Sequence, residues 1–101
     1  MTTRLFEPSA ETDLNEIIDF LSGHAGTAVA LKYATAFQRA FDRIRDFPAG
    51  GSPRPFFGAD TRVVIVQPYL IFYDYMIETD TVHVLRILHP RRNITLGLVR
   101  S

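Results

Sequence analysis

The residues of this chain best suited to chemistry lie near its C-terminus. Arg86, His89, Arg91 and Arg92 place three guanidinium groups and one imidazole within seven residues. No acidic residue follows Asp80, so nothing further along the sequence neutralises this charge. The stretch begins in an apolar run that indicates a buried strand, and a strand ending in concentrated positive charge suggests a polyanionic or acidic partner. The alternative is a tail whose charges are only solvated.

Length and composition predict one domain over residues 1–101, because a chain of this size with 47% hydrophobic residues can bury one core. The net charge is zero, but residues 1–50 carry seven acids and five bases, whereas residues 51–101 carry four acids and six bases. This asymmetry is too small to indicate a nucleic-acid-binding domain by itself, and direct DNA binding is not expected. The only lysine is Lys32.

Several classes of protein are disfavoured. The chain has no cysteine, and its histidines, at positions 24, 83 and 89, lack metal-ligand spacing, so no metal and no cofactor are expected. The N-terminus has no apolar signal segment, and the longest apolar stretch, residues 63–73, is too short to span a bilayer. We therefore expect a cytoplasmic protein without a membrane partner.

Two helices are predicted in the first half of the chain, after a short strand over residues 4–7. Ser9 is a suitable N-cap for the first helix, and Gly23 and Gly26 are expected to end it. Its apolar stripe consists of Leu14, Ile17, Ile18 and Leu21.

The second helix is predicted from an N-cap at Thr27 to Pro48. Its apolar face is rich in aromatic side chains, which indicates core packing rather than a cofactor site. That face consists of Tyr33, Phe37, Phe41, Ile44 and Phe47. On the exposed side, Arg39 and Arg43 are expected to pair with the aspartates three residues further on.

The second half of the chain predicts a sheet. An ordered loop rich in proline and glycine covers residues 48–60, and three strands follow over residues 61–66, 69–78 and 81–89. A two-residue hairpin loop is expected at Thr79-Asp80. Simple alternation in the last strand would place Val82, Val84, Arg86 and Leu88 on one face and His83, Leu85, Ile87 and His89 on the other.

This order, β-α-α-β-β-β, predicts an α+β domain in which a two-helix hairpin packs on one face of an antiparallel sheet. Four segments then carry a resemblance to a known family. They are Ala10-x-x-Asp13-Leu14-x-x-Ile17-x-x-Phe20, Ile44-Arg45-Asp46-Phe47-Pro48-x-Gly50, Arg62 with Tyr69-Leu70-Ile71-Phe72-Tyr73, and Val84-Leu85-Arg86-Ile87-Leu88-His89. In order and spacing, over nearly the whole chain, the sequence resembles the ParE/RelE superfamily of type II toxin–antitoxin toxins, nearer the ParE branch.

The resemblance implies a bacterial toxin of the plasmid-stabilisation type, neutralised by a cognate antitoxin in a hetero-oligomer. In the ParE branch the toxin inhibits DNA gyrase by protein–protein binding and stops growth, with no catalytic residue of its own. Under that reading, Arg86, His89, Arg91 and Arg92 are the candidate target-binding residues. A relative that binds antitoxin but has lost its toxicity is an open alternative.

In the RelE branch the toxin cleaves mRNA in the ribosome. Such a nuclease would need His89 as acid or base and Arg54, Arg62 and Arg86 to hold phosphate charge. The chain departs from that pattern, because it has no lysine after Lys32 and no tyrosine after residue 75. The structural alternatives are that His89 bonds the local backbone at the strand end, and that Arg62 and Arg86 are solvated or neutralise carboxylates such as Asp74.

Overall fold

A computed structural model describes residues 1–101, and it contains the six predicted elements in the predicted order. Two short elements were not predicted: a strand within the loop at residues 48–60 and a helix after the last strand. The helices and strands are β1 (Thr3–Phe6), α1 (Pro8–Ala25), α2 (Thr27–Asp46), β2 (Ser52–Pro53), β3 (Thr61–Val66), β4 (Tyr69–Met76), β5 (Thr81–Leu88) and α3 (Leu96–Val99). Single 3-10 turns lie at Pro48–Gly50, Pro55–Phe57 and Ile77–Thr79. The predicted α+β class is confirmed.

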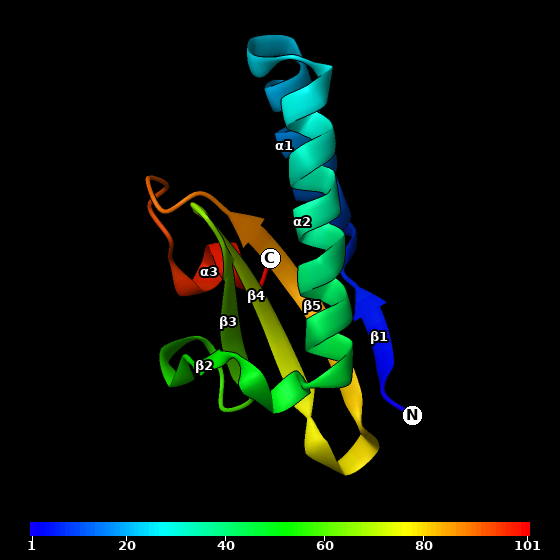
Figure 1. The fold of residues 1–101 in the computed structure, drawn as a ribbon. Coiled ribbons are helices and arrows are strands. Elements are labelled where there is room, and N and C mark those ends of the chain that lie inside the picture. The colour runs from blue at the N-terminus through cyan, green and yellow to red at the C-terminus, as the bar shows by residue number, and fades with distance from the viewer.

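The strands form one five-stranded sheet in the order β1-β5-β4-β3-β2. The pairs β2–β3, β3–β4 and β4–β5 are antiparallel, as predicted, but β1 runs parallel to β5. A parallel neighbour needs a crossover, and the α1–α2 hairpin supplies it by carrying the chain from one edge of the sheet toward the other. Figure 1 shows this hairpin lying across the sheet and extending well beyond its upper end.

The main core lies between the helix hairpin and the sheet. From α2 it takes the buried side chains of Phe37, Phe41 and Ile44, which belong to the predicted aromatic face. From the sheet it takes Ile71, Tyr73, Val82, Val84 and Ile87 among others. Phe47, which we placed on the same face, lies at the end of α2 and is 70% exposed, because the chain leaves the helix there.

The ends of the helices differ from the sequence prediction. α1 begins at Pro8, and Ser9 is not its cap: the Ser9 hydroxyl donates instead to the carbonyl oxygens of Leu85 and Ser101. α1 also continues through Gly23 and ends at Gly26, whose φ of 93° reverses the chain in a conformation that favours glycine. α2 starts directly after that residue, so Gly26 and not Thr27 occupies the N-cap.

Two further local predictions were wrong. On α2, Asp42 and Asp46 pair with Arg45 rather than with Arg39 or Arg43, and Asp42 also pairs with Arg4 of β1. The β4–β5 connection is not a two-residue hairpin loop: β4 ends at Met76, a 3-10 turn follows, and Asp80 takes a left-handed conformation at φ 49°. That conformation is tolerated by aspartate better than by most residues.

A β-bulge in β5 overturns the simple alternation that we predicted for this strand. Phe72 lies opposite Arg86 and Tyr73 lies opposite Val84, so Leu85 is an extra residue without a partner on β4. As a result, Val84 and Ile87 belong to the core under the helix hairpin, whereas Leu85 and Leu88 belong to a second buried cluster.

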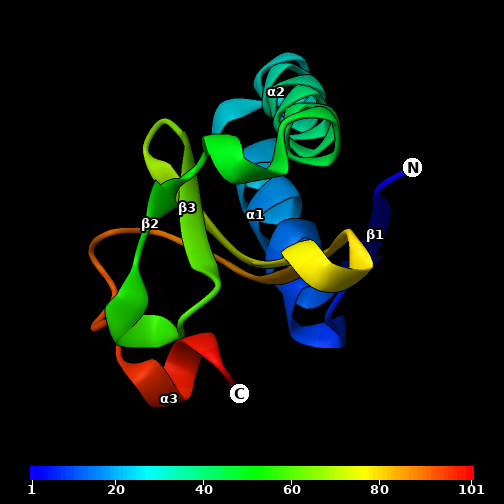
Figure 2. The same cartoon turned by 90° about the horizontal axis from the view of Figure 1, so that it is seen from below.

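The second cluster lies on the other face of the sheet, beneath α3. It joins Leu85 and Leu88 to Val63, Phe72 and Val99. Figure 2, seen from below, shows α3 on the opposite side of the sheet from α2. The residues after β5 are therefore not simply a solvated tail: the segment beyond residue 95 folds back and closes the second face.

Candidate functional site

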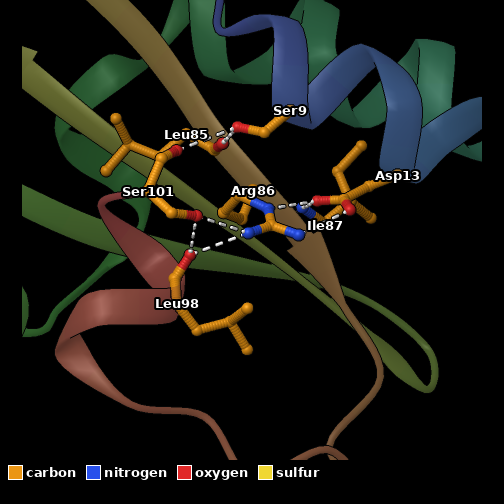
Figure 3. A network of polar contacts seen from close by, with 7 residues as sticks. All are labelled: Ser9, Asp13, Leu85, Arg86, Ile87, Leu98 and Ser101. Carbon is orange, nitrogen blue, oxygen red and sulfur yellow. Dashed lines mark hydrogen bonds and ion pairs between the residues drawn. The ribbon is translucent and has the colours of Figure 1, made fainter.

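Beyond Val84, β5 has no strand on its outer side, because β1 pairs only as far as Phe6 opposite Val84. The first turns of α1 cover this open edge instead. The backbone N–H of Glu7 donates to the carbonyl of Val84 at 2.9 Å, and the N–H of Ile87 donates to Oδ2 of Asp13 at 3.0 Å. The strand edge is thus completed by Glu7, at the N-cap of α1, and by Asp13 within the helix; Figure 3 shows Asp13 beside Ile87.

Arg86 and Asp13 form a bidentate ion pair inside the domain. Nε of Arg86 lies 2.7 Å from Oδ2 of Asp13, and Nη2 lies 2.8 Å from Oδ1. Both residues are buried, with 8% and 7% of their surface exposed. Hydrogen bonding to Asp13, together with its negative charge, raises the pKa of Arg86 against the opposing effect of burial, so the guanidinium stays charged. A buried ion pair of this kind requires the full set of hydrogen bonds that it makes here.

The same guanidinium fixes the C-terminus. Nη1 of Arg86 donates to the carbonyl of Leu98 at 2.8 Å and to the hydroxyl of Ser101 at 2.9 Å (Figure 3). Arg86 therefore joins α1, β5 and α3. We expected it to contact a target or to neutralise a carboxylate such as Asp74. Instead, Arg86 lies inside the domain and its carboxylate partner is Asp13, so its side chain is not available at the surface.

The ion-pair partner of Asp74 is a different arginine, Arg100. Nη2 of Arg100 lies 2.9 Å from Oδ2 of Asp74, and the hydroxyl of Thr61 donates to Oδ1 at 2.6 Å. The hydrogen bond and the charge of Asp74 raise the pKa of Arg100, while burial acts in the opposite direction. Because Arg100 also donates to the carbonyl of Phe57, this second arginine holds α3 to the loop before β3.

The residues that a nuclease would use are not arranged as one phosphate-binding cluster. Arg62 donates to the carbonyls of Ala49 and Gly51 at 2.9 and 2.8 Å and so holds the loop after α2. Arg54 is exposed and donates to the carbonyl of its neighbour Pro53. His89 accepts a hydrogen bond at Nδ1 from the backbone N–H of Arg91, which is the local backbone contact that we weighed against a catalytic role.

The groove at the basic end of β5 brings together two of the predicted target-binding residues. It has a volume of about 250 Å³, and His89 and Arg92 line it with Glu16 and Phe20 of α1. Phe20 is 56% exposed, and Tyr69 also lines the groove, with its ring centroid 5.6 Å from that of His89. Arg91 and Arg92 are both exposed. The groove therefore combines apolar and aromatic surface with an exposed arginine.

A second recessed surface lies between α2 and β3. A hollow of about 350 Å³ is lined by Val29, Lys32, Tyr33, Ala36, Val66 and Gln67. A smaller one, of about 180 Å³, is lined by Arg43, Ile44, Phe47, Gly50, Gly51 and Val64. The sequence did not indicate this surface, because its residues come from a helix and a strand that are distant in the chain.

Sequence reasoning also missed Asp13 and Ser101 as partners of Arg86. A signal for Asp13 was present, since it lies three residues after Ala10 and four before Ile17, on the side of α1 that faces the sheet. No group of three or more His, Asp or Glu side chains is arranged to hold a metal ion. None of the helices combines the length with the apolar character that spanning a bilayer requires.

The chain is thus a small α+β protein with recessed surfaces at the basic end of β5 and between α2 and β3. The sequence matches the family described as ParE toxin of type II toxin–antitoxin system, parDE, over residues 5–94. Because that match covers most of the chain, the protein belongs to the ParE toxin family.

One solved structure supports the same fold. It is described as the chromosomal ParDE TA system from P. aeruginosa, and its matched chain aligns with a TM-score of 0.72 at 20% sequence identity. The alignment covers 88% of this chain and 96% of the other. A comparison with curated proteins finds no significant match.

Proposed function

We propose that this protein is the toxin of a type II toxin–antitoxin system, that it acts in the cytoplasm by binding DNA gyrase, and that a cognate antitoxin neutralises it. Membership of the ParE toxin family supports the toxin role. The structural relative from P. aeruginosa is described as a ParDE toxin–antitoxin system, which supports an antitoxin as the partner of this chain as well.

The observation that carries the target assignment is the exposed basic loop beside the groove at the end of β5. His89, Arg91 and Arg92 extend from a strand end that the sheet and α1 hold in place, next to the exposed ring of Phe20. Aromatic residues and arginines of this kind are enriched in protein interfaces. Such a surface fits a partner that presents acidic groups around an apolar contact.

The nuclease alternative has less support. Its four candidate residues would have to converge on one phosphate, but Arg86 is engaged with Asp13 and Arg62 with the loop carbonyls. A catalytic group must lie within hydrogen-bond reach of the reacting atoms. The geometry therefore favours binding over phosphodiester chemistry.

Expression of the protein without its antitoxin tests the proposal. We expect growth arrest with an SOS response and filamentous cells. Arg91→Ala combined with Arg92→Ala should weaken toxicity, because truncating an arginine that is desolvated in a complex costs about 2–5 kcal/mol. The same purified double variant should unfold like the parent protein and retain antitoxin binding, since both side chains are exposed.

Arg54→Ala is the discriminating control. Arg54 is exposed and belongs only to the nuclease set, so its removal should leave gyrase-dependent toxicity unchanged. Codon-positioned cuts in ribosome-bound mRNA, abolished by His89→Ala, would replace gyrase inhibition with the nuclease function. Unchanged toxicity of the Arg91/Arg92 double variant would mean that the basic loop is only solvated charge.

A further inference from the structure

The groove at the basic end of β5 has room for one aromatic side chain. Its volume is about 250 Å³, whereas a cavity of about 150 Å³ is large enough to bind benzene. The apolar part of its lining comes from Ile17 and Phe20 of α1 and from Tyr69 and Ile87 of the sheet. The imidazole of His24 stacks on the Phe20 ring at 4.2 Å between centroids, so this exposed ring is supported by a neighbour on its own helix.

The polar part of the lining holds two unpaired ions of opposite charge. Glu16 and Arg92 both line the groove, yet neither forms an ion pair. Asp13 lines it as well, but the two hydrogen bonds from Arg86 neutralise that carboxylate. His89 accepts a backbone hydrogen bond at Nδ1, as a neutral imidazole does. The charges that remain cancel, so the groove favours a neutral guest over an anion or a cation.

A neutral aromatic side chain with a hydrogen-bond donor satisfies both ions. The Glu16 carboxylate can accept the hydrogen of the donor, and the Arg92 guanidinium is attracted to the face of the ring. The indole of tryptophan meets both requirements, because its N–H only donates and its ring is the best aromatic partner for a cation. A phenyl ring lacks the donor, and an aliphatic side chain lacks both features. Tryptophan is also enriched among the residues that contribute most to binding at protein interfaces.

We propose that the groove at the basic end of β5 binds one tryptophan side chain of the target, with the indole N–H donating to Glu16 and the ring against Phe20 and Arg92. The inference rests on the proposed function and names the side chain by which gyrase is anchored at this site. Arg91 is exposed and does not line the groove, so it is available to the acidic groups around that anchor.

A small indole tests the site without any partner protein. The chain contains no tryptophan, so the fluorescence of an added indole reports its binding directly. The probe is N-acetyl-tryptophanamide at micromolar concentration, titrated with the purified full chain. We expect a blue shift that saturates with a dissociation constant on the order of 0.1–1 mM. The same probe with a methyl group on the indole nitrogen has no donor and should bind roughly tenfold more weakly.

Three variants connect the probe to the proposed contacts. Phe20→Ala removes part of the apolar wall and should weaken the binding of both probes. Glu16→Ala should weaken the binding of N-acetyl-tryptophanamide by roughly tenfold and leave the methylated probe nearly unchanged, so that the two bind alike. Glu11→Ala is the matched control, because Glu11 is an exposed glutamate of the same helix that does not line the groove.

Binding of purified gyrase distinguishes the anchor from simple attraction between charges. Removing a carboxylate from this protein should, if anything, strengthen its binding to an acidic partner, and Glu11→Ala should show at most that effect. With the tryptophan anchor, Glu16→Ala should instead weaken gyrase binding by roughly tenfold. Phe20→Ala should weaken it by at least as much. Both side chains are exposed, so both variants should unfold like the parent protein.

The outcomes separate the inference from the function on which it rests. If the parent chain does not bind gyrase, the proposed function fails, and the assignment of the anchor to gyrase fails with it. If gyrase binds Glu16→Ala as tightly as Glu11→Ala, the tryptophan anchor is refuted and the gyrase-binding function stands. Equal binding of the two probes to the parent chain, or no binding of either, would also overturn the inference.

Discussion

Replacing Asp13 with alanine should be among the most damaging single substitutions in this domain. The change removes both hydrogen bonds to the Arg86 guanidinium, at 2.7 and 2.8 Å, and the bond from the Ile87 N–H at 3.0 Å. It leaves a cation with 10% of its side chain exposed and without its carboxylate. Breaking a buried ion pair from one side costs about 3–5 kcal/mol.

For Asp13→Ala we expect a cost at the lower end of this range of about 3–5 kcal/mol. Arg86 keeps its bonds to the Leu98 carbonyl and the Ser101 hydroxyl, so the uncompensated charge is not wholly without partners. A loss of about 3 kcal/mol is a large part of the 5–15 kcal/mol that stabilises a typical domain. At roughly 4–8 °C per kcal/mol for a domain near this size, the melting temperature should fall by more than about 10 °C.

Urea unfolding followed by far-ultraviolet circular dichroism measures the cost. Asp19→Ala is the matched control, because Asp19 is an exposed aspartate on the same helix and should change the free energy of unfolding by less than about 0.5 kcal/mol. Combining Asp13→Leu with Arg86→Met should cost less than the sum of the two single changes, since no charge remains unpaired. A cost below about 1 kcal/mol for Asp13→Ala, or strict additivity in the double variant, would refute the reasoning.

Two further outcomes are expected near the loop that follows α2. Gly51→Ala should destabilise the fold by about 1–3 kcal/mol in urea unfolding, because its new Cβ would lie 2.9 Å from Cε1 of Tyr73. Gly50→Ala is the control and should cost much less, because the nearest atom to its new Cβ is 3.8 Å away. Equal losses of unfolding free energy in the two variants would contradict this steric argument. Burial raises the pKa of the Tyr73 phenol, so its contribution to stability is complete below the unfolded value of about 10 and is lost as pH rises through the folded value. Tyr73→Phe should therefore lose less stability than the parent protein between pH 8 and pH 11, and an identical pH profile of the unfolding free energy would argue against that linkage.

Much of the fold was predictable because the signals that specify it are local. The apolar stripe of α1 and the aromatic face of α2 repeat at helical spacing, and the β-branched run at residues 61–66 coincides with β3. The helix ends were less predictable. Ser9 has the chemistry of a cap, but its hydroxyl is used by Leu85 and Ser101, which are remote in the chain.

The parts that could not be predicted depend on contacts between distant residues. The bulge at Leu85 changes which face Arg86 and Leu88 occupy, and only the pairing with β4 reveals it. Asp13 and Arg86 are 73 positions apart, so spacing carries no information about their contact. The sequence did indicate that Arg86, an arginine among apolar neighbours, must have a polar partner. The structure shows that this partner is Asp13.

The contrast between the C-terminal arginines determines how their mutants can be interpreted. Arg86 and Arg100 each hold the C-terminal segment to the rest of the domain, whereas Arg91 and Arg92 are exposed between them. Substituting Arg86 should release α3 and uncover the second buried cluster, so toxicity and antitoxin binding should be lost together with stability. Substituting Arg91 and Arg92 should affect the target contact alone. A loss of toxicity therefore identifies a contact residue only when the unfolding free energy of the same variant is unchanged, and Arg86 cannot be assigned to the target surface from growth assays by themselves.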